Sequence, residues 1–538
     1  MKGEKVVFEG YILKCFRSFT LVFITTVSAF AAVPKLPIII DSDFTDWPEQ
    51  KGRETIRAAS DSDYVYLYFK ISEETVFQEN FGINLYFDTD DDPATGRDGA
   101  EIRWSAGSRS AALYSANGSQ KSTARHAAFG FIAAPTIDSD EFEIRVSRDY
   151  FPGPSASVTI EYTTIGFLET LGFTLEDADL VVSRSADRSP FSDLRLVSYN
   201  VLRDGLQSSS RSSRFGSEIS FLAPDVLALQ ESDGDSLTWM RAIDPRFVAM
   251  ASNSGCQIVS RFPMVNDWNL DGNVAAQLRV SNSQDLLLIC VHLPCCSNVF
   301  GRGFELGTIT NFIQAIRSGL IAGVAADIPI VTVGDCNFVR EDSSQIVDFE
   351  SDTASVRQKV LHLNENRFTT WENPSSSFSP GRLDWCFLTE GIVAVNSFIY
   401  KDTQPSDHLP LVFDLGFNTD GDSLPDLWEV FYFGDRAETD SGNFDSDSLS
   451  NLEEYRSGTS PSNFGDQQEV RLTIQDGHSG FLTWTAVTGS KYSLLVSDDL
   501  DDWRELDWSI EGISGEVSLP LESLGTGGFY RIVVESAN

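Results

Sequence analysis

The sequence predicts a multidomain protein in which a layered α/β domain stands between β-rich segments. The chain has 538 residues, more than one hydrophobic core usually organises. Residues 192–416 alternate strand-like apolar runs with helical patterns, whereas residues 34–183 and 467–538 show short runs typical of strands. Residues 417–462 are rich in Asp, Asn, Ser and Gly, which indicates a linker.

Composition restricts the classes of partner. Hydrophobic residues make up 41% of the chain and aromatic residues 12%, which argues against a disordered protein. The net charge of −39 disfavours nonspecific binding to nucleic acid or to an acidic membrane, and it favours divalent cations. We expect a monomer.

The N-terminus has the pattern of an export signal. Basic residues from Lys2 to Arg17 precede the apolar run "FTLVFITTVSAFAA", and Ala29-Phe30-Ala31 fits a cleavage site. We predict a signal peptide over residues 1–31, and therefore a secreted, extracellular or cell-surface protein; the alternative is a buried first strand. The run is too short for a membrane span, and no later segment is long and apolar enough for one.

Residues 34–183 predict a β-sandwich. "YVYLYFKI" and "FEIRVSR" alternate as strands, and "LYFDTDDDPATGRDGAEIRW" places an acidic loop between two strands. With "IDSDFTDW", this segment resembles the carbohydrate-binding modules of family 9, which implies a glycan or cell-surface ligand. Trp47 and Trp104 are candidates for a sugar-binding platform or for the core. Four loop carboxylates are either calcium ligands or a solvated hairpin tip: Asp88, Asp90, Asp92 and Asp98.

The central segment carries its polar residues at strand ends. "FGSEISFLAPDVLALQE" indicates a helix followed by a strand, and "ELGTITNFIQAIRSGL" indicates an amphipathic helix before the strand "IPIVTVGD". Six motifs follow in order: "LVSYNVL", "LALQES", "LICVHLP", "VTVGDCNFV", "GRLDWCFL" and "PSDHLPLVF". Strand ends are where sites assemble in layered α/β folds, because the strand fixes the backbone and the loop frees the side chain.

These motifs supply four carboxylates, two amides and two imidazoles. The residues are Asn200, Glu231, His292, Asp335, Asn337, Asp384, Asp407 and His408. Carboxylate and amide oxygens suit a hard divalent cation, which leaves the imidazoles for acid–base work or phosphate contact. Each residue alone has an ordinary structural explanation, such as a turn cap, a solvated strand end or a satisfied core histidine. The prediction depends on all six motifs occurring together.

The ordered series resembles the endonuclease/exonuclease/phosphatase family of metal-dependent phosphodiesterases over about 225 residues. The resemblance implies a four-layered α/β sandwich and a site with Mg²⁺ or Mn²⁺. It implies that Asn200, Glu231 and Asp407 hold the metal. It also implies that Asp335 orients or deprotonates the attacking water. The remaining implied catalytic residues are His292, Asn337, Asp384 and His408.

Two departures bear on the substrate. Cys336 replaces an aromatic residue that usually follows the aspartate, and His292 stands where abasic-site enzymes tend to carry tyrosine. We therefore expect a secreted phosphodiesterase acting on a phosphoester, with extracellular nucleic acid as the favoured substrate. A phosphatase or phospholipase-type activity is the first alternative, since no basic track is evident. A calcium-stabilised glycan-binding or adhesion protein with an inactive core is the second.

The linker contains two copies of a 12-residue calcium-loop pattern. "NTDGDSLPDLWE" carries Asn418, Asp420, Asp422, Asp426 and Glu429 at positions 1, 3, 5, 9 and 12. "NFDSDSLSNLEE" repeats the pattern with Asn443, Asp445, Asp447, Asn451 and Glu454. The pair resembles thrombospondin type-3 and dockerin-like repeats, which implies structural Ca²⁺. Ser423 and Ser448 stand at position 6, where glycine is usual, so we expect reduced affinity.

Two features remain open. Residues 467–538 resemble the small C-terminal β domains of exported bacterial proteins, and surface attachment is a hypothesis. The cysteines of the central region show no zinc pattern, and their pairing cannot be deduced. They are Cys256, Cys290, Cys295, Cys296, Cys336 and Cys386.

Overall fold

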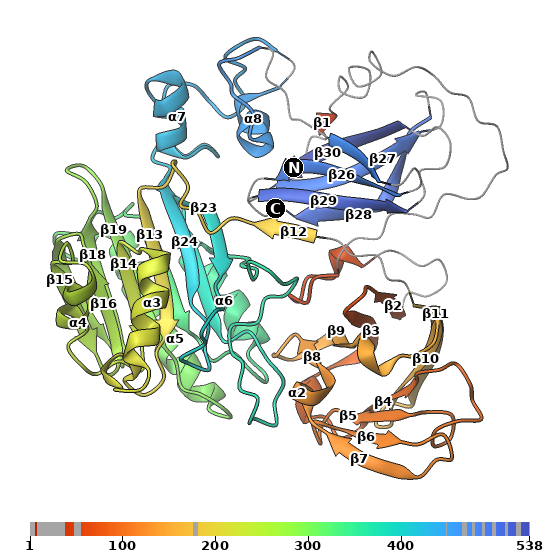
Figure 1. Ribbon diagram of the computed structural model, residues 1–538. Coiled ribbons are helices and arrows are strands. Elements are labelled where there is room, and N and C mark those ends of the chain that lie inside the picture. Colours follow the sequence, from red (N-terminus) through yellow and green to blue (C-terminus); the bar gives the residue numbers. More distant parts are fainter. Residues whose placement is uncertain are drawn as a thin grey trace.

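The computed structural model describes most of the chain beyond its first residues. The described ranges are 6–7, 38–47, 55–175, 181–447, 449–464, 471–475, 479–486, 490–497, 502–511, 515–522 and 529–536. The predicted signal peptide therefore lies outside the described residues, apart from β1 (Val6–Val7). Figure 1 shows an N-terminal β domain, a central α/β domain, a linker and a C-terminal β domain along the chain.

The central domain contains two six-stranded sheets. The first has the order β15-β16-β14-β13-β24-β23 and the second the order β17-β18-β19-β20-β22-β21. The strands of the first sheet are β13 (Leu194–Asn200), β14 (Val226–Gln230), β15 (Ala249–Asn253), β16 (Cys256–Ser260), β23 (Ile392–Ile399) and β24 (Leu411–Phe417). Those of the second are β17 (Met264–Leu270), β18 (Asn273–Arg279), β19 (Asp285–His292), β20 (Ile330–Asp335), β21 (Ser355–Arg357) and β22 (Asp384–Thr389).

Helices cover the outer faces of these sheets. Leu196 and Val333 point to the core between the sheets, whereas Val197 packs outward beneath a helix layer. The helices on the first sheet are α3 (Ser212–Leu222) and α4 (Ser236–Ile243). The helices on the second are α5 (Val299–Arg317) and α6 (Ser343–Thr353). The order is therefore helices, sheet, sheet, helices, and the inner strands β13, β14, β19 and β20 bury both of their faces.

The N-terminal domain packs two antiparallel sheets around an aromatic-rich core. The four-stranded sheet contains β2 (Ile56–Ser60), β3 (Tyr64–Thr75), β9 (Ser139–Ser147) and β8 (Ile132–Ala134). The six-stranded sheet contains β11 (Phe167–Thr174), β10 (Ser155–Tyr162), β4 (Ile83–Asp88), β5 (Ile102–Ser105), β6 (Ser110–Tyr114) and β7 (Gln120–Ala124). Trp47 is 3% exposed and Trp104 is 1% exposed, so neither indole presents a platform to solvent.

The C-terminal domain also has two sheets, with the orders β1-β30-β27-β28 and β12-β29-β26-β25. Its strands are β25 (Arg471–Gln475), β26 (Ser479–Ala486), β27 (Ser490–Ser497), β28 (Arg504–Glu511), β29 (Gly515–Glu522) and β30 (Phe529–Ser536). The strand β12 (Val181–Arg184) pairs with β29, although it precedes the central domain in the chain. The expected N-terminal boundary at residue 183 thus falls inside a strand of the C-terminal domain.

The linker between these domains contains two short helices, α7 (Asp426–Phe433) and α8 (Asn451–Ser457). Each begins at or just after position 9 of one acidic loop. Figure 1 shows them next to the C-terminal domain, beyond the end of β24. The Tyr492 hydroxyl of β27 donates to the Arg456 carbonyl, which ties the second helix to the C-terminal domain.

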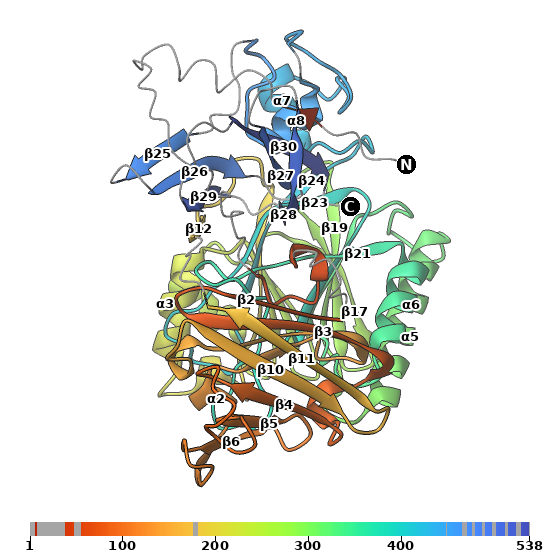
Figure 2. The same cartoon turned by 90° about the vertical axis from the view of Figure 1, so that its right-hand side faces the viewer.

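The N-terminal domain contacts the central domain directly, and Figure 2 shows its strands passing in front of the central sheets. Ile40 and Arg367 form a parallel bridge, and Ile137 forms another with Arg340. Arg340 also pairs with Glu79 at 2.8 Å. The sandwich is therefore anchored on loops of the α/β domain.

Candidate active site

Asp335, the last residue of β20, lies at the centre of the predicted site and is 2% exposed. Three side chains from other elements converge on its Oδ2 atom. The Asn200 Nδ2 atom donates to it at 3.0 Å, and the Nε2 atoms of His292 and His408 each lie 3.6 Å from it. Motifs from four separate parts of the chain thus meet at one carboxylate oxygen.

Strand register explains the meeting. In the parallel pair β13–β14, Asn200 lies opposite Gln230, so Glu231 follows at the same edge. In the second sheet, Asp335 of β20 lies opposite His292 of β19 and opposite Asp384 of β22. Because β19 and β20 are parallel, their C-terminal ends carry His292 and Asp335 to the same side of the domain.

Gly334 permits the close approach of β19 and β20 at this point. Its φ is 145°, and an added Cβ would lie 2.1 Å from the Val291 carbonyl oxygen. No other residue type fits there without moving the backbone. The glycine of "VTVGDCNFV" therefore places the following aspartate against β19.

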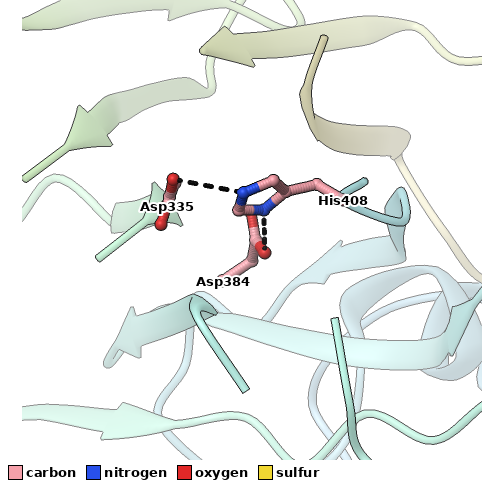
Figure 3. A group of neighbouring side chains, drawn as sticks. All are labelled: Asp335, Asp384 and His408. Atoms are coloured by element: carbon pink, nitrogen blue, oxygen red, sulfur yellow. Dashed lines mark hydrogen bonds and ion pairs between the residues drawn. The ribbon is translucent and has the colours of Figure 1, made fainter. Parts of the chain in front are cut away.

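His408 lies between two aspartates, as Figure 3 shows. Its Nδ1 atom lies 2.8 Å from the Asp384 Oδ2 atom, and its Nε2 atom faces Asp335. The Thr370 hydroxyl accepts hydrogen bonds from the backbone N–H groups of Leu383 and Asp384, both at 2.9 Å. Asp384 therefore orients the imidazole, and Thr370 fixes the start of the strand that carries Asp384.

These groups change one another's acidity. Burial raises the pKa of the Asp335 carboxyl to about 6, although the His408 charge opposes that rise. Burial disfavours the charged form of His408, but the Asp384 and Asp335 carboxylates outweigh it and raise its pKa to about 10. At neutral pH, Asp335 is therefore mostly ionised and His408 is protonated. The site pairs a carboxylate that can accept a proton with a fixed cation.

Glu231 and Asp407 are the carboxylates that the sequence assigned to a metal. The half-buried Glu231 accepts from the Asn200 Nδ2 atom at 3.2 Å and from the Arg203 backbone N–H at 2.9 Å. The Asp407 Oδ1 atom is buried and has no hydrogen-bond partner within the described ranges. An orphaned buried carboxylate oxygen is a candidate ligand for Mg²⁺ or Mn²⁺. The acidic group that lies close enough to share an ion at the site is Asp335, Asp384 and His408, so a metal held by Glu231 and Asp407 stays a prediction.

Asn337 and Asp407 are both hydrogen-bonded to neighbouring residues of the site. The Asn337 backbone N–H donates to the Asp335 Oδ1 atom at 3.1 Å, and its side chain donates to the Leu293 carbonyl at 3.0 Å. The Asp407 Oδ2 atom accepts from the Trp371 indole at 3.2 Å and from the Asn373 amide at 3.4 Å. Asn337 thus ties the β20 end to the β19 end.

Several residues of the site were not expected from the sequence. The Ser406 hydroxyl donates to the Asn200 carbonyl at 2.8 Å and joins the first motif to the last. The only sign of this role in the sequence is that Ser406 lies inside the motif "PSDHLPLVF". Thr370, Trp371 and Asn373 lie between motifs, and only their nearness in sequence to "GRLDWCFL" pointed to them.

The two linker loops share one pattern of hydrogen bonds. Asn418 Nδ2 donates to the Asp422 carbonyl, and Asn443 Nδ2 donates to the Asp447 carbonyl. At position 9, Asp426 accepts from the backbone N–H of Thr419, and the Asn451 side chain accepts from that of Phe444. Two acidic groups gather in the loops: Asp420, Asp426 and Glu429, and Asp445, Asp447 and Glu454.

Glu429 is the most unusual carboxylate of the linker. Its side chain is 0% exposed, and neither carboxylate oxygen has a hydrogen-bond partner among the residues that the structure describes. Burial, with the charges of Asp420 and Asp422, raises its pKa to about 8. A buried carboxylate without a hydrogen-bond partner is unfavourable unless a positive charge lies beside it.

The acidic hairpin of the N-terminal domain is better satisfied. Asp88, Asp90 and Glu101 lie close enough to share an ion. However, the Glu101 oxygens accept from Thr89 and Thr95, and Asp98 pairs with Arg103 at 2.6 Å. Asp92 accepts from the backbone N–H of Ala94, two residues along the same loop. Hydrogen bonds within the hairpin account for these carboxylates without an ion.

The six cysteines of the described residues are free thiols. Cys295 and Cys296 are exposed, and the other four are buried. Cys336 is 1% exposed beneath the site, and burial raises the pKa of its thiol well above the usual value. Along the parts of the chain that are described, no helix is both long and apolar enough to cross a membrane.

Comparisons with known proteins give a family for this domain. Residues 197–408 match the sequence model of the endonuclease/exonuclease/phosphatase family. A search of curated proteins found no match. The matched range begins in β13 and ends at His408, so it contains every residue of the site described above.

Similar solved structures share little sequence. One is an endonuclease/exonuclease/phosphatase from Bacteroides vulgatus, with 16% identity, 42% of this chain and 99% of that chain covered, and a TM-score of 0.34. Another is from Beutenbergia cavernae DSM 12333, with 14% identity, 63% and 95% covered, and a TM-score of 0.31. A third is ANGEL2, a 2′,3′-cyclic phosphatase, with 16% identity, 41% and 95% covered, and a TM-score of 0.30.

Proposed function

Because residues 197–408 form a domain of the endonuclease/exonuclease/phosphatase family, we propose that the protein is a secreted, metal-dependent phosphodiesterase that cleaves extracellular nucleic acid. The convergence of Asn200, His292 and His408 on the Asp335 Oδ2 atom is the observation that carries the proposal. The family match supports phosphoester hydrolysis. The export pattern of residues 1–31 supports action outside the cell.

Each residue of the site has a separate role in the proposed hydrolysis of a phosphoester. The Asp335 carboxylate accepts a proton from the attacking water as the new P–O bond forms. The bond from phosphorus to the leaving oxygen breaks, and that oxygen takes up a proton from the His408 imidazolium, while His292 contacts the phosphate or the leaving oxygen. His408, oriented by Asp384, is protonated at neutral pH and suits a phosphate oxygen. Glu231, Asn200 and Asp407 would hold Mg²⁺ or Mn²⁺, which offsets negative charge on the phosphate when bound.

A second activity has its own support. Acidic residues outnumber basic ones in residues 192–416, so the domain does not attract a long polyanion through its overall charge. This favours a phosphatase or phospholipase-type reaction on small or lipid phosphoesters at the same residues.

We also propose that the linker binds calcium, at sites separate from the active site. Glu429, buried with two unpartnered oxygens, completes a 12-residue loop that carries carboxylates at positions 3 and 5. The second loop has the same 12-residue spacing of oxygen-bearing residues and ends in Glu454. Bound Ca²⁺ would tie together carboxylates that otherwise repel, and so would stiffen the connection to the C-terminal domain.

Hydrolysis assays test the enzyme proposal. Plasmid DNA, an oligonucleotide, a small phosphodiester and a phospholipid are incubated with the full chain and Mg²⁺ or Mn²⁺. We expect cleavage of nucleic acid that falls at least about a hundredfold in Asp335→Ala and His408→Ala. The control is Asp327→Ala, an exposed aspartate near the opposite end of β20. Cleavage of the phospholipid alone would replace the nuclease with the second activity, and no metal-dependent cleavage of any substrate would refute the enzyme.

A further inference from the structure

One loop of the central domain, residues 371–381, lies between the active site and the N-terminal domain. Its base is closed by an antiparallel bridge between Trp371 and Gly381, and Trp371 forms a second antiparallel bridge with His408. The Glu372 backbone N–H also donates to the Asp407 carbonyl at 2.7 Å. The base of this loop is therefore hydrogen-bonded to the segment that carries Asp407 and His408.

The side chains at the base reach the Asp407 carboxylate itself. The Trp371 indole and the Asn373 amide both donate to its Oδ2 atom. Its Oδ1 atom is buried and, within the described residues, has no hydrogen-bond partner. The orientation of the unpartnered oxygen thus depends on how the loop holds the partnered one.

The tip of the same loop is held by the N-terminal domain. The Gln78 Oε1 atom accepts from the Ser379 backbone N–H at 2.9 Å. The His126 Nε2 atom lies 3.0 Å from the Ser376 carbonyl oxygen, which it reaches as a donor. Gln78 is 8% exposed and His126 is 2% exposed, so both contacts are shielded from water.

An aromatic contact adds to these hydrogen bonds. The Arg109 guanidinium lies 4.0 Å from the centroid of the Phe378 ring, and its Nη1 atom donates to the Gln78 carbonyl at 3.1 Å. Arg109 therefore braces Gln78 and covers Phe378 at the same time. Side chains from three separate segments of the sandwich therefore contact residues 376–379.

We propose that the N-terminal sandwich helps to order the active site, and that its Gln78 and His126 are positioning residues. By fixing the tip of the 371–381 loop, they hold Trp371 and Asn373 against Asp407. The inference rests on the proposed phosphodiesterase function for its catalytic consequence. It differs from the expectation of an independent ligand-binding module, because the role of the domain is to order a loop of its neighbour.

Substitutions at Gln78 in the full chain test the role. Gln78→Met removes the acceptor for Ser379 at similar volume, and Gln78→Glu keeps it. We expect Gln78→Met to speed hydrogen exchange of the amides of residues 376–379, measured without metal or substrate. We expect kcat to fall about tenfold, as for other residues that orient a ligand, with KM changed less than about twofold. Gln78→Glu should restore both values.

The matched control is Gln120→Met, which places the same substitution on exposed β7 of the same domain. Unchanged exchange in Gln78→Met would overturn the proposal, and so would faster exchange with unchanged kcat. If Gln78→Met does not fold, the pair His126→Leu and His126→Gln carries the same comparison. If the wild-type chain cleaves no phosphoester, the proposed function and the catalytic role both fall. The exchange measurement still shows whether the sandwich holds the loop.

Discussion

At the scale of single residues, the site depends on two neighbouring groups whose acidities have moved apart. Burial raises the pKa of Asp335 to about 6. For His408, burial acts against the charge, and Asp384 and Asp335 more than compensate for it. One group is therefore a base and the other an acid over the same range of pH, which suits acid–base chemistry on one phosphoester.

The pH dependence of kcat/KM follows from these directions. We expect the rate to rise as Asp335 ionises near pH 6 and to fall as His408 loses its proton near pH 10. In Asp384→Asn the upper limb should move down by about one pH unit or more, because a carboxylate that favours the imidazolium is gone. The lower limb is the internal control. It should not move up, since Asp384 raises the pKa of Asp335. An unchanged upper limb in pH–rate profiles would contradict this assignment.

At the scale of elements, the first linker loop differs from the expectation based on position 6, and Ser448, at position 6 of the second, lies outside the described residues. The left-handed backbone lies at position 4 in both loops, with a φ of 84° at Gly421 and 63° at Ser446. Ser423, at position 6 of the first loop, is not in that region. The reduced affinity inferred from serine at position 6 therefore has no backbone basis in the first loop. In the second, Ser446 takes the conformation that glycine adopts most easily.

Calcium binding to the first loop should release a proton. The pKa of Glu429 is about 8 in the calcium-free chain, so this carboxyl is mostly protonated at pH 7 and must ionise to bind the ion. Titration calorimetry at pH 7 in buffers of different protonation enthalpy should show release of about one proton, and release should vanish above about pH 9. Glu429→Gln should abolish this binding event, whereas Glu438→Gln in the same linker should not. Binding without proton release would refute the assignment.

At the scale of the whole molecule, the grouping of side chains at strand ends could be predicted from the sequence, whereas the contacts between domains could not. His292 and Asp335 lie side by side because each ends a strand and the register of β19 and β20 pairs them. Asn200 ends a strand of the other sheet and donates to Asp335 from there. No local sequence pattern predicts that β12 pairs with β29, because a short strand can join the open edge of any sheet. Nor does any motif connect Gln78 with Ser379, because the contact depends on the docking of two finished domains.

The same docking brings one lysine of the central domain to a buried acidic cluster of the N-terminal domain. Asp41, 1% exposed at its side chain, lies 2.9 Å from the Lys359 Nζ atom, and burial raises its pKa. Burial also raises the pKa values of Asp46 and Glu143, and the charge of Asp41 raises both further. Carboxyls with raised pKa values contribute full stability only below their unfolded values, and that contribution is lost as pH rises through the folded values.

The loss of Lys359 should therefore matter most at high pH, when the carboxyls are ionised and need its charge. We expect Lys359→Met to lower the free energy of unfolding by about 1–2 kcal/mol at pH 8, because the lysine is partly exposed, and by less at pH 5. Lys359→Arg should retain most of the stability. Lys121→Met, at an exposed lysine of β7, is the matched control. Thermal unfolding of the full chain at the two pH values measures the difference, and an equal loss at both would show that Lys359 acts through packing rather than through charge.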